Sequence, residues 1–214
     1  MKYLRKFETE ADVDMSVVPN VVLVGDTGKI VYNALNGVFI QHINGSLYTT
    51  DEWTAGGFTN DQANGVAVGN GVVRFVVAKT TLTSVKWSDT ASLIEGVLVT
   101  EDENTAKTDY AGITNTQIIA RNDTTGAAHA CANYIFPNGK KGYLPSYGEL
   151  YLANQKKTAI QTAMNLIGGV KLNYTYWSST QVSSTLAWGY DFYWRRFSNY
   201  SKTSTSLVLP FTTL

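Results

Sequence analysis

An aromatic residue stands at every second position between residues 188 and 195, and this spacing constrains the fold more than any other feature of the chain. The aromatic set is Trp188, Tyr190, Phe192 and Trp194. The residues between them are Gly189, Asp191, Tyr193 and Arg195. Successive side chains of a β-strand point to opposite faces, so a period of two predicts a strand with one face on the core and one in solvent.

The middle of the chain has helical patterns instead. Residues 115–121 and 127–134 are short candidates, the second rich in alanine, which favours helix. Ser146 followed by Glu149 forms a capping box, which predicts that a helix begins there. Apolar residues recur at helical spacing within 160–167, and two glycines then supply a stop.

Before and after this middle region, short β-branched runs are separated by turn residues. The expected strands are 17–24, 29–32, 38–40, 66–68, 72–78, 84–87, 96–99 and 207–211, with a polar loop at 198–206. Strands that flank a helical middle predict an α+β protein. We expect residues 1–45 to form a β-rich attachment or oligomerisation segment, and residues 46–214 to form one larger domain.

Composition limits the partners. Lys plus Arg and Asp plus Glu both count 17, so no global field draws the chain to nucleic acid or to an anionic membrane. No run approaches the roughly 18 apolar residues of a membrane span. Aromatic residues make up 12% of the chain and charged residues only 16%, so many rings must lie near the surface, as they do in binding proteins.

Signals for catalysis or metal binding are weak. The two histidines, His42 and His129, lie far apart without nearby carboxylates. The acidic residues of 101–103 and Asp109 fit no EF-hand spacing, so a solvated loop is favoured over a calcium site. Cys131, the single cysteine, lies in an apolar run that favours a buried thiol over a reactive one. We expect no cofactor, no metal and no catalytic residue.

Several motifs together resemble one family. Residues 139–149 read Gly-Lys-Lys-Gly-Tyr-Leu-Pro-Ser-Tyr-Gly-Glu, residues 167–169 read Ile-Gly-Gly, and residues 176–180 read Tyr-Trp-Ser-Ser-Thr. This combination is similar to the C-type-lectin-fold variable proteins of diversity-generating retroelements, many of which are phage tail receptor-binding or tropism proteins. The resemblance extends over about residues 40–214. It implies a C-type-lectin-like fold behind a small N-terminal β module.

The resemblance also implies a variable region at about residues 176–214. The scaffold would be Trp177, Ser178, Ser179, Ala187, Trp188, Phe192, Phe197, Val208 and Pro210. The displayed, ligand-binding positions would be Gln181, Ser183, Gly189, Asp191, Tyr193, Trp194, Arg195, Arg196, Ser198, Tyr200, Thr203 and Thr205. Strand parity alone would place Trp194 inside, whereas the resemblance displays it. Tyr, Trp, Arg, Ser, Thr and Gly are also the residues of antibody-type binding surfaces; the plainer interpretation is an outer sheet face and a polar loop.

The function implied is non-enzymatic binding of a bacterial cell-surface receptor, protein or glycan, by a phage tail protein. Other tail proteins would be partners, and tail proteins of this kind often form homotrimers, although the sequence does not give the oligomeric state. The N-terminus lacks the apolar stretch of a signal peptide, which favours synthesis in the host cytoplasm and incorporation into a virion. Two alternatives stay open: a bacterial cell-surface adhesin, and a relative of the formylglycine-generating oxidases, whose copper-assisted chemistry normally uses two thiols.

Overall fold

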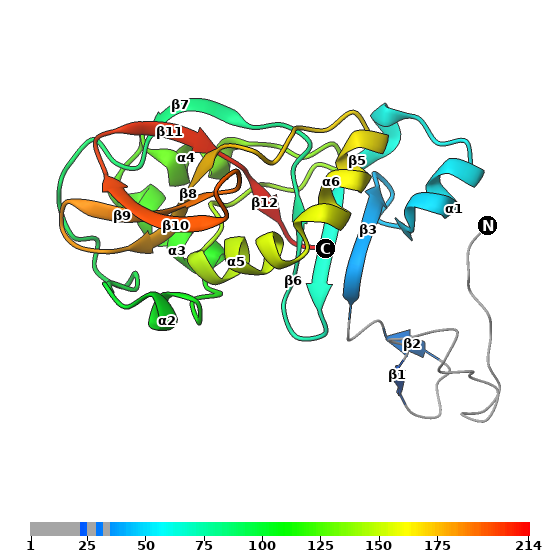
Figure 1. Cartoon of the computed structure of the whole chain (residues 1–214), viewed down its shortest axis with the longest axis horizontal. Helices are drawn as coiled ribbons and strands as arrows, with labels where there is room; N and C mark the ends of the chain where they lie inside the picture. The colour runs from blue at the N-terminus through cyan, green and yellow to red at the C-terminus, as the bar shows by residue number, and fades with distance from the viewer. Residues whose placement is uncertain (1–21, 25–28, 32–34) are drawn as a thin grey trace.

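The computed structural model describes residues 22–24, 29–31 and 35–214 of the chain (Figure 1). At its N-terminal side, β1 (Val22–Val24) pairs antiparallel with β2 (Lys29–Val31). The two strands match the expected hairpin where it is described. The turn predicted at 26–28 and the rest of the strand predicted at 17–24 lie outside the described residues.

A first, antiparallel sheet has the spatial order β12-β6-β5-β3-β4. Its strands are β3 (Asn36–His42), β4 (Leu47–Tyr48), β5 (Ala63–Asn70), β6 (Arg74–Val77) and β12 (Phe211–Thr212). β5 is buried along its length up to Gly69, because both of its faces are covered.

The domain boundary expected after residue 45 does not coincide with the edge of this sheet. β3 lies between β5 and β4 and pairs with β5 from Asn36 to His42. Residues 36–42 therefore belong to the same sheet as strands that follow residue 45. A strand that supplies hydrogen bonds to two neighbours cannot be separated from them without leaving both ladders unpaired.

A second sheet lies at the other end of the molecule, with the order β10-β9-β8-β11-β7 (Figure 1). Its strands are β7 (Leu82–Lys86), β8 (Thr175–Gln181), β9 (Leu186–Asp191), β10 (Arg196–Ser201) and β11 (Thr205–Val208). β8 and β11 run parallel, whereas the other neighbours are antiparallel. β8 is the central strand, and β10 is an edge strand.

The end of the chain joins the two sheets. The single strand expected over 207–211 is divided into β11 and β12 around Pro210, which lacks an N–H for a sheet ladder. The strand expected over 96–99 is also absent: Val99 makes only an isolated bridge to Gln181, and Gly96 has a φ of 84° that turns the chain.

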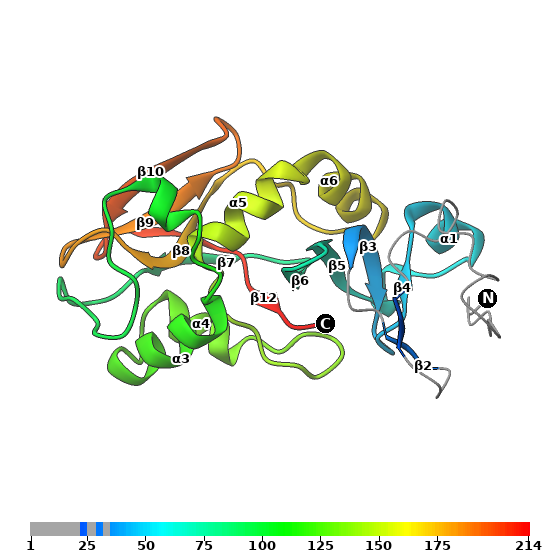
Figure 2. The same ribbon diagram turned by 90° about the horizontal axis from the view of Figure 1, so that it is seen from below.

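Helices cover both faces of the second sheet, with α5 on one side and α3 and α4 on the other, whereas α6 packs against β3 and β5 of the first sheet (Figure 2). The helices are α1 (Thr50–Ala55), the 3-10 turn η3 (Asn60–Gln62), α2 (Glu103–Ala106), α3 (Gly112–Asn122), α4 (Ala127–Asn133), α5 (Tyr147–Gln155) and α6 (Lys157–Leu166). None of the helices in the described part of the chain is long and apolar enough to span a membrane. The mixture of helix and sheet confirms the α+β class.

Local sequence signals account for the helices. The capping box predicted at Ser146 and Glu149 is present at the start of α5, where the Ser146 N–H donates to Glu149 Oε2 at 2.8 Å. α3 and α4 include the two short helices expected upstream. The chain turns at Lys156 after α5 ends, and a second helix, α6, begins at Lys157. Ile160 and Met164 of α6 are buried in the core as their spacing predicts.

Candidate ligand-binding surface

The turn between β9 and β10 carries the most exposed aromatic side chains of the C-terminal region. Asp191 Oδ1 accepts hydrogen bonds from the backbone N–H groups of Tyr193 at 2.8 Å and Trp194 at 2.9 Å. Arg195 has a φ of 54°, a left-handed conformation that side chains rarely adopt. This turn holds Tyr193 and Trp194 outward, 64% and 65% exposed, with their rings 4.8 Å apart in a T-shaped contact.

The strand expected over 188–195 therefore ends at Asp191. Trp188, Tyr190 and Phe192 are buried, as the alternation predicts. Trp194 is exposed because the turn interrupts that alternation. The other residues expected to form the scaffold are buried too, except Phe197, which is partly buried and stacks on Tyr147.

The positions expected to be displayed fall into three groups by exposure. The exposed group is Tyr193, Trp194, Arg195, Arg196, Thr203 and Thr205. The partly buried group is Ser183, Asp191, Ser198 and Tyr200. The buried group is Gln181 and Gly189.

The expectation that Gln181 is displayed is wrong. Its Nε2 donates to the carbonyl oxygen of Ile94 at 2.9 Å, and its Oε1 accepts from the backbone N–H of Ile94 at 3.0 Å. The same Oε1 accepts from Lys202 Nζ at 2.7 Å. Lys202 is also fully buried, with its ammonium 4.6 Å from the centre of the Trp87 ring. Gln181 is thus the centre of a buried polar network that ties β8 to two loops.

The expectation for Gly189 is also wrong. A Cβ atom at Gly189 would lie 3.1 Å from both the Tyr176 carbonyl oxygen and the Tyr200 ring. Tyr200 packs over this glycine and meets Trp177 edge to face, with 5.9 Å between ring centres. The Tyr200 ring therefore contributes to packing, and its partial burial separates it from the exposed aromatic residues of the turn.

The exposed positions form two separate patches. We name Tyr193, Trp194, Arg195 and Arg196 the hairpin patch, and the exposed Thr203 and Thr205 together with the partly buried Ser183 the far patch. They lie at opposite ends of β10, whose six residues at roughly 3.3 Å per residue separate them by about 17 Å. One small ligand cannot contact both patches.

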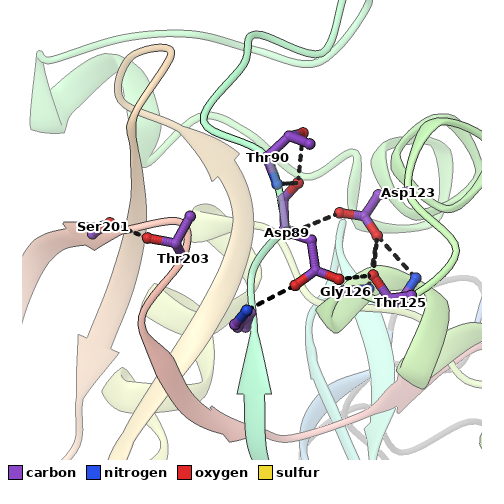
Figure 3. Close-up of polar contacts among 9 residues, drawn as sticks. Asp89, Thr90, Asp123, Thr125, Gly126, Ser201 and Thr203 are labelled. Atoms are coloured by element: carbon purple, nitrogen blue, oxygen red, sulfur yellow. Dashed lines mark hydrogen bonds and ion pairs between the residues drawn. The ribbon is translucent and has the colours of Figure 1, made fainter.

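The far patch adjoins a loop that is held by two carboxylates (Figure 3). Ser201 and Thr203 hydrogen bond to each other at 3.0 Å, and the Ser88 N–H donates to the Lys202 carbonyl oxygen at 3.1 Å. Beyond them, Thr125 Oγ1 lies 2.5 Å from Asp89 Oδ2 and 2.8 Å from Asp123 Oδ1. Burial raises the pKa of Asp123, but hydrogen bonds from Ser88, Thr125 and the backbone lower it to about 2. These carboxylates fasten the loop after β7 to the start of α4.

Arg195 of the hairpin patch lines two cavities. A cavity of about 260 Å³ is lined by Arg195 and by α6 residues that include Lys157, Gln161 and Asn165. A second cavity, of about 200 Å³, is lined by Glu103, Tyr151, Asn154, Tyr190, Arg195, Arg196 and Phe197. Sequence reasoning missed the residues from α2, α5 and α6, because only the tertiary fold brings them beside the turn.

Positive charge exceeds negative charge around these cavities. In the part of the chain that the structure describes, the ion pairs are Lys86–Asp89 and Lys107–Glu103, both at 2.9 Å. Among these described residues, neither Arg195 nor Arg196 has a carboxylate at ion-pair distance. Partial burial and the charge of Arg195 lower the pKa of Lys157, whereas Asp191 raises it. The side chains that line the two cavities therefore carry a net positive charge.

Comparison with known proteins finds a structure with a similar fold but identifies no family. No family model matches the chain, and no curated protein matches it. Among solved structures it is similar to a fimbrial protein from Bacteroides ovatus ATCC 8483, with a TM-score of 0.59 and 15% sequence identity. The match covers 82% of this chain and 48% of that one, so this chain spans about half the length of the fimbrial protein. The two share a fold.

The acidic segment and the cysteine have structural surroundings. Asp102 caps α2, accepting from the Thr105 N–H at 2.9 Å. Asp109 is buried and accepts from Thr180 Oγ1 at 2.7 Å, so it is not part of the solvated loop expected here. Among the described residues, no three acidic, histidine or cysteine side chains are grouped as metal ligands. Cys131 is buried as expected, and burial raises the pKa of its thiol well above the usual value.

Proposed function

We propose that the chain is a non-enzymatic recognition protein that binds a bacterial cell-surface ligand through the hairpin patch, on a C-type-lectin-like scaffold. The observation that carries this proposal is the exposure of Tyr193 and Trp194 on a turn that Asp191 braces with two hydrogen bonds. Rigid aromatic side chains give large contact areas at low entropic cost, and an adjacent arginine adds a planar set of donors.

The setting we favour is a bacterial surface structure, with the chain acting as an adhesin. The support is the likeness in fold to a fimbrial protein from Bacteroides ovatus. The phage tail setting, with a homotrimer and tail-protein partners, rests on the resemblance to retroelement-diversified proteins. An adenine-rich near-copy of codons 176–214 beside the gene would support diversification in either setting, and a neighbouring tail gene or fimbrial gene would separate the two.

The oxidase alternative is disfavoured by the state of Cys131. A catalytic thiol must reach the thiolate form and its substrate, and burial opposes both. The side chains gathered at the hairpin patch supply cationic and aromatic contacts rather than a nucleophile with an adjacent base.

The test replaces Tyr193, Trp194 and Arg196 together with alanine. Exposed substitutions usually change stability by less than about 0.5 kcal/mol each, so the melting temperature should stay within a few degrees of wild type. Aromatic and arginine anchors each typically contribute about 2 kcal/mol or more, so adsorption to bacterial cells that bind the wild-type protein should be lost.

A matched control replaces Tyr110, Ile113 and Arg121 with alanine. These side chains are also exposed and also include an aromatic residue and an arginine, but they belong to α3 and the segment before it. The control should adsorb like wild type. Full adsorption by the hairpin variant, with both variants folded, would show that the site lies on another surface.

A further inference from the structure

The Glu149 carboxyl is buried at the start of α5 with no cation beside it. The residue is 4% exposed, and Gly112, the first residue of α3, packs so closely on Glu149 Oε2 that a Cβ atom at that glycine would collide with it. In the part of the chain that the structure describes, no ion pair includes Glu149. Burial without a cation disfavours the charged form of a carboxyl group, so Glu149 holds a proton more tightly than an exposed glutamate does.

The titratable groups that face Glu149 are also acids. Asp109 and Tyr110 come from the segment before α3, and Tyr143 comes from the segment before α5. Asp109 is itself buried, and its charge raises the pKa of Glu149. Burial raises the pKa of both tyrosines, so they stay neutral near pH 7. None of these three groups offsets a negative charge on Glu149.

The charged residues of the elements packed around the start of α5 lie elsewhere. Lys156 and Lys157 follow the far end of α5, about 10 Å from the carboxyl at 1.5 Å per residue. Lys107 pairs with a glutamate of α2 at 2.9 Å, and Arg121 lies in the last turn of α3. β8 carries no charged residue, and Asp191 of β9 accepts hydrogen bonds in the hairpin turn.

The hydrogen bonds at Ser146 indicate that the carboxyl carries the missing proton. Ser146 Oγ lies 2.6 Å from the Asp109 carbonyl oxygen and 3.1 Å from Glu149 Oε2. A serine hydroxyl has one hydrogen, and the shorter contact, to a carbonyl oxygen, must use it. The contact with Glu149 is then a hydrogen bond only if the carboxyl donates it. Electrostatics agrees: burial raises the pKa of Glu149 from 4.5 to about 7, although hydrogen bonds from Ser146 and Tyr143 oppose the rise.

The first turn of α5 supports the strand that carries the hairpin patch. Tyr147 stacks on Phe197 of β10, with 3.4 Å between ring centres and 13° between ring planes. It also meets Trp188 of β9 edge to face, and its backbone N–H donates to Thr180 Oγ1 at 2.9 Å. Phe197 directly follows Arg196 of the patch. A change at the start of α5 therefore reaches β10 through one ring contact.

We propose that Glu149 couples the uptake of a proton to the support of the hairpin patch. With its proton, the carboxyl donates to Ser146 and holds the start of α5 against β10. Without the proton, a negative charge lies buried beside Asp109 and the bond to Ser146 Oγ is lost. The stack between Tyr147 and Phe197 then loosens. This coupling is a property of the fold and does not depend on which ligand the patch binds.

The experiment measures urea unfolding of wild type and Glu149→Gln between pH 5 and pH 7.5. The folded carboxyl binds its proton more tightly than the unfolded one, so stability is lost as pH rises from about 4.5 to about 7. We expect the unfolding constant of wild type to rise about tenfold more over this range than that of Glu149→Gln. The glutamine is neutral at every pH and should make the protein more stable than wild type at pH 7.5. Equal pH dependence in the two proteins would refute the proposal.

A matched control and a direct measurement support this comparison. Glu103→Gln neutralises an exposed glutamate and should keep the wild-type difference between pH 5 and pH 7.5. If Glu149→Gln does not fold, the carboxyl carbon shift of Glu149 in wild type decides: a midpoint near pH 7 supports the proposal, and one below pH 5 refutes it.

Amide hydrogen exchange tests the link to the patch. Between pH 6 and pH 8, after correction for the intrinsic exchange rate, wild type should lose at least threefold protection in the first turn of α5 and in β10, whereas Glu149→Gln should lose none. Loss confined to α5 would refute the coupling to β10. Adsorption to cells at pH 6 that is abolished in the hairpin variant would leave the recognition function standing whichever result is obtained here.

Discussion

Two regions of the C-terminal half are buried and exposed against the usual preferences of their residues. The polar row of β8, Ser178, Ser179, Thr180 and Gln181, is completely buried. The hairpin patch is exposed, although it contains two aromatic residues. β8 is the central strand of its sheet and contacts helices α3 and α5, whereas β9 and the edge strand β10 carry the hairpin turn beyond the layers. Position in the sheet, and not residue type, decides which region can meet a ligand.

Each side chain of the polar row has a partner in the core. Ser178 Oγ donates to the Trp188 carbonyl oxygen at 2.9 Å, and Thr180 Oγ1 donates to Asp109 at 2.7 Å. Asn115 Nδ2 donates to Ser179 Oγ at 3.2 Å. A buried row of this kind stays stable only while it is fully satisfied, because an unpaired polar atom in a low-dielectric core costs about 1–3 kcal/mol. The predictions below test this contrast.

The largest expected effect is that of Gln181→Ala. It leaves the backbone groups of Ile94 without their partner and removes one of the two acceptors of the buried Lys202 ammonium, which keeps the Ser92 carbonyl oxygen at 2.7 Å. We expect the free energy of unfolding to fall by about 2–4 kcal/mol, because several buried polar groups lose a hydrogen-bond partner at a cost of about 1–3 kcal/mol each. Urea unfolding measures the loss, with the exposed Gln117→Ala of α3 as the control. A loss below 1 kcal/mol would mean that Gln181 resembles the displayed positions after all.

The second effect concerns pH and Lys202. Burial lowers the pKa of Lys202 to about 8 in the folded protein, below the ordinary value of 10.5. Between these two values the unfolded chain binds more protons at this site, so the free energy of unfolding rises as pH increases from about 8 to about 10.5. The contribution is of the order of 1–3 kcal/mol. Lys202→Met should have a flatter pH dependence than wild type over this window; identical slopes would contradict the assignment.

The third effect moves to the hairpin turn, with Asp191→Ala. Tyr193 and Trp194 lose the acceptor for their backbone N–H groups, which should cost about 1–2 kcal/mol of stability. Because the turn also positions the patch, adsorption to target cells should fall more than stability does. Asp191→Asn keeps an oxygen acceptor and should recover most of both properties. An Asn variant that is as impaired as the Ala variant would show that charge, rather than turn geometry, matters here.

The smallest effect is expected at Arg195. Its φ of 54° is strained for any side chain, so Arg195→Gly should raise the free energy of unfolding by about 0.5 kcal/mol, after the added flexibility of the unfolded chain offsets part of the gain. Arg195→Ala keeps the strain and should not stabilise. Both variants should bind less well, because both lose the guanidinium. Thermal melts of the pair separate strain from charge, and a Gly variant less stable than the Ala variant would refute the strain.

Sequence reasoning succeeded where the cause was local. The capping box joins Ser146 to Glu149 within one helical turn, so its residues alone specify it. The burial of Trp188, Tyr190 and Phe192 follows from the period of a strand. The polar run at 198–206 was misassigned as a loop because β10 is an edge strand, where polar residues are tolerated. Its ladder to β9 depends on the neighbour rather than on its own residues.

By itself, then, the sequence determined the α+β class, the start of α5, the inward face of β9 and the exposure of Tyr193. Tertiary structure alone decided that Gln181 is buried, that Tyr200 covers Gly189, and that Tyr151 and Asn154 stand beside Arg195 and Arg196. The physical reason is the distance along the chain over which each cause acts. Caps and strand periods are set by residues a few positions apart, whereas burial and cavities depend on which distant strand or helix becomes the neighbour, and that choice is made by the packing of the whole chain.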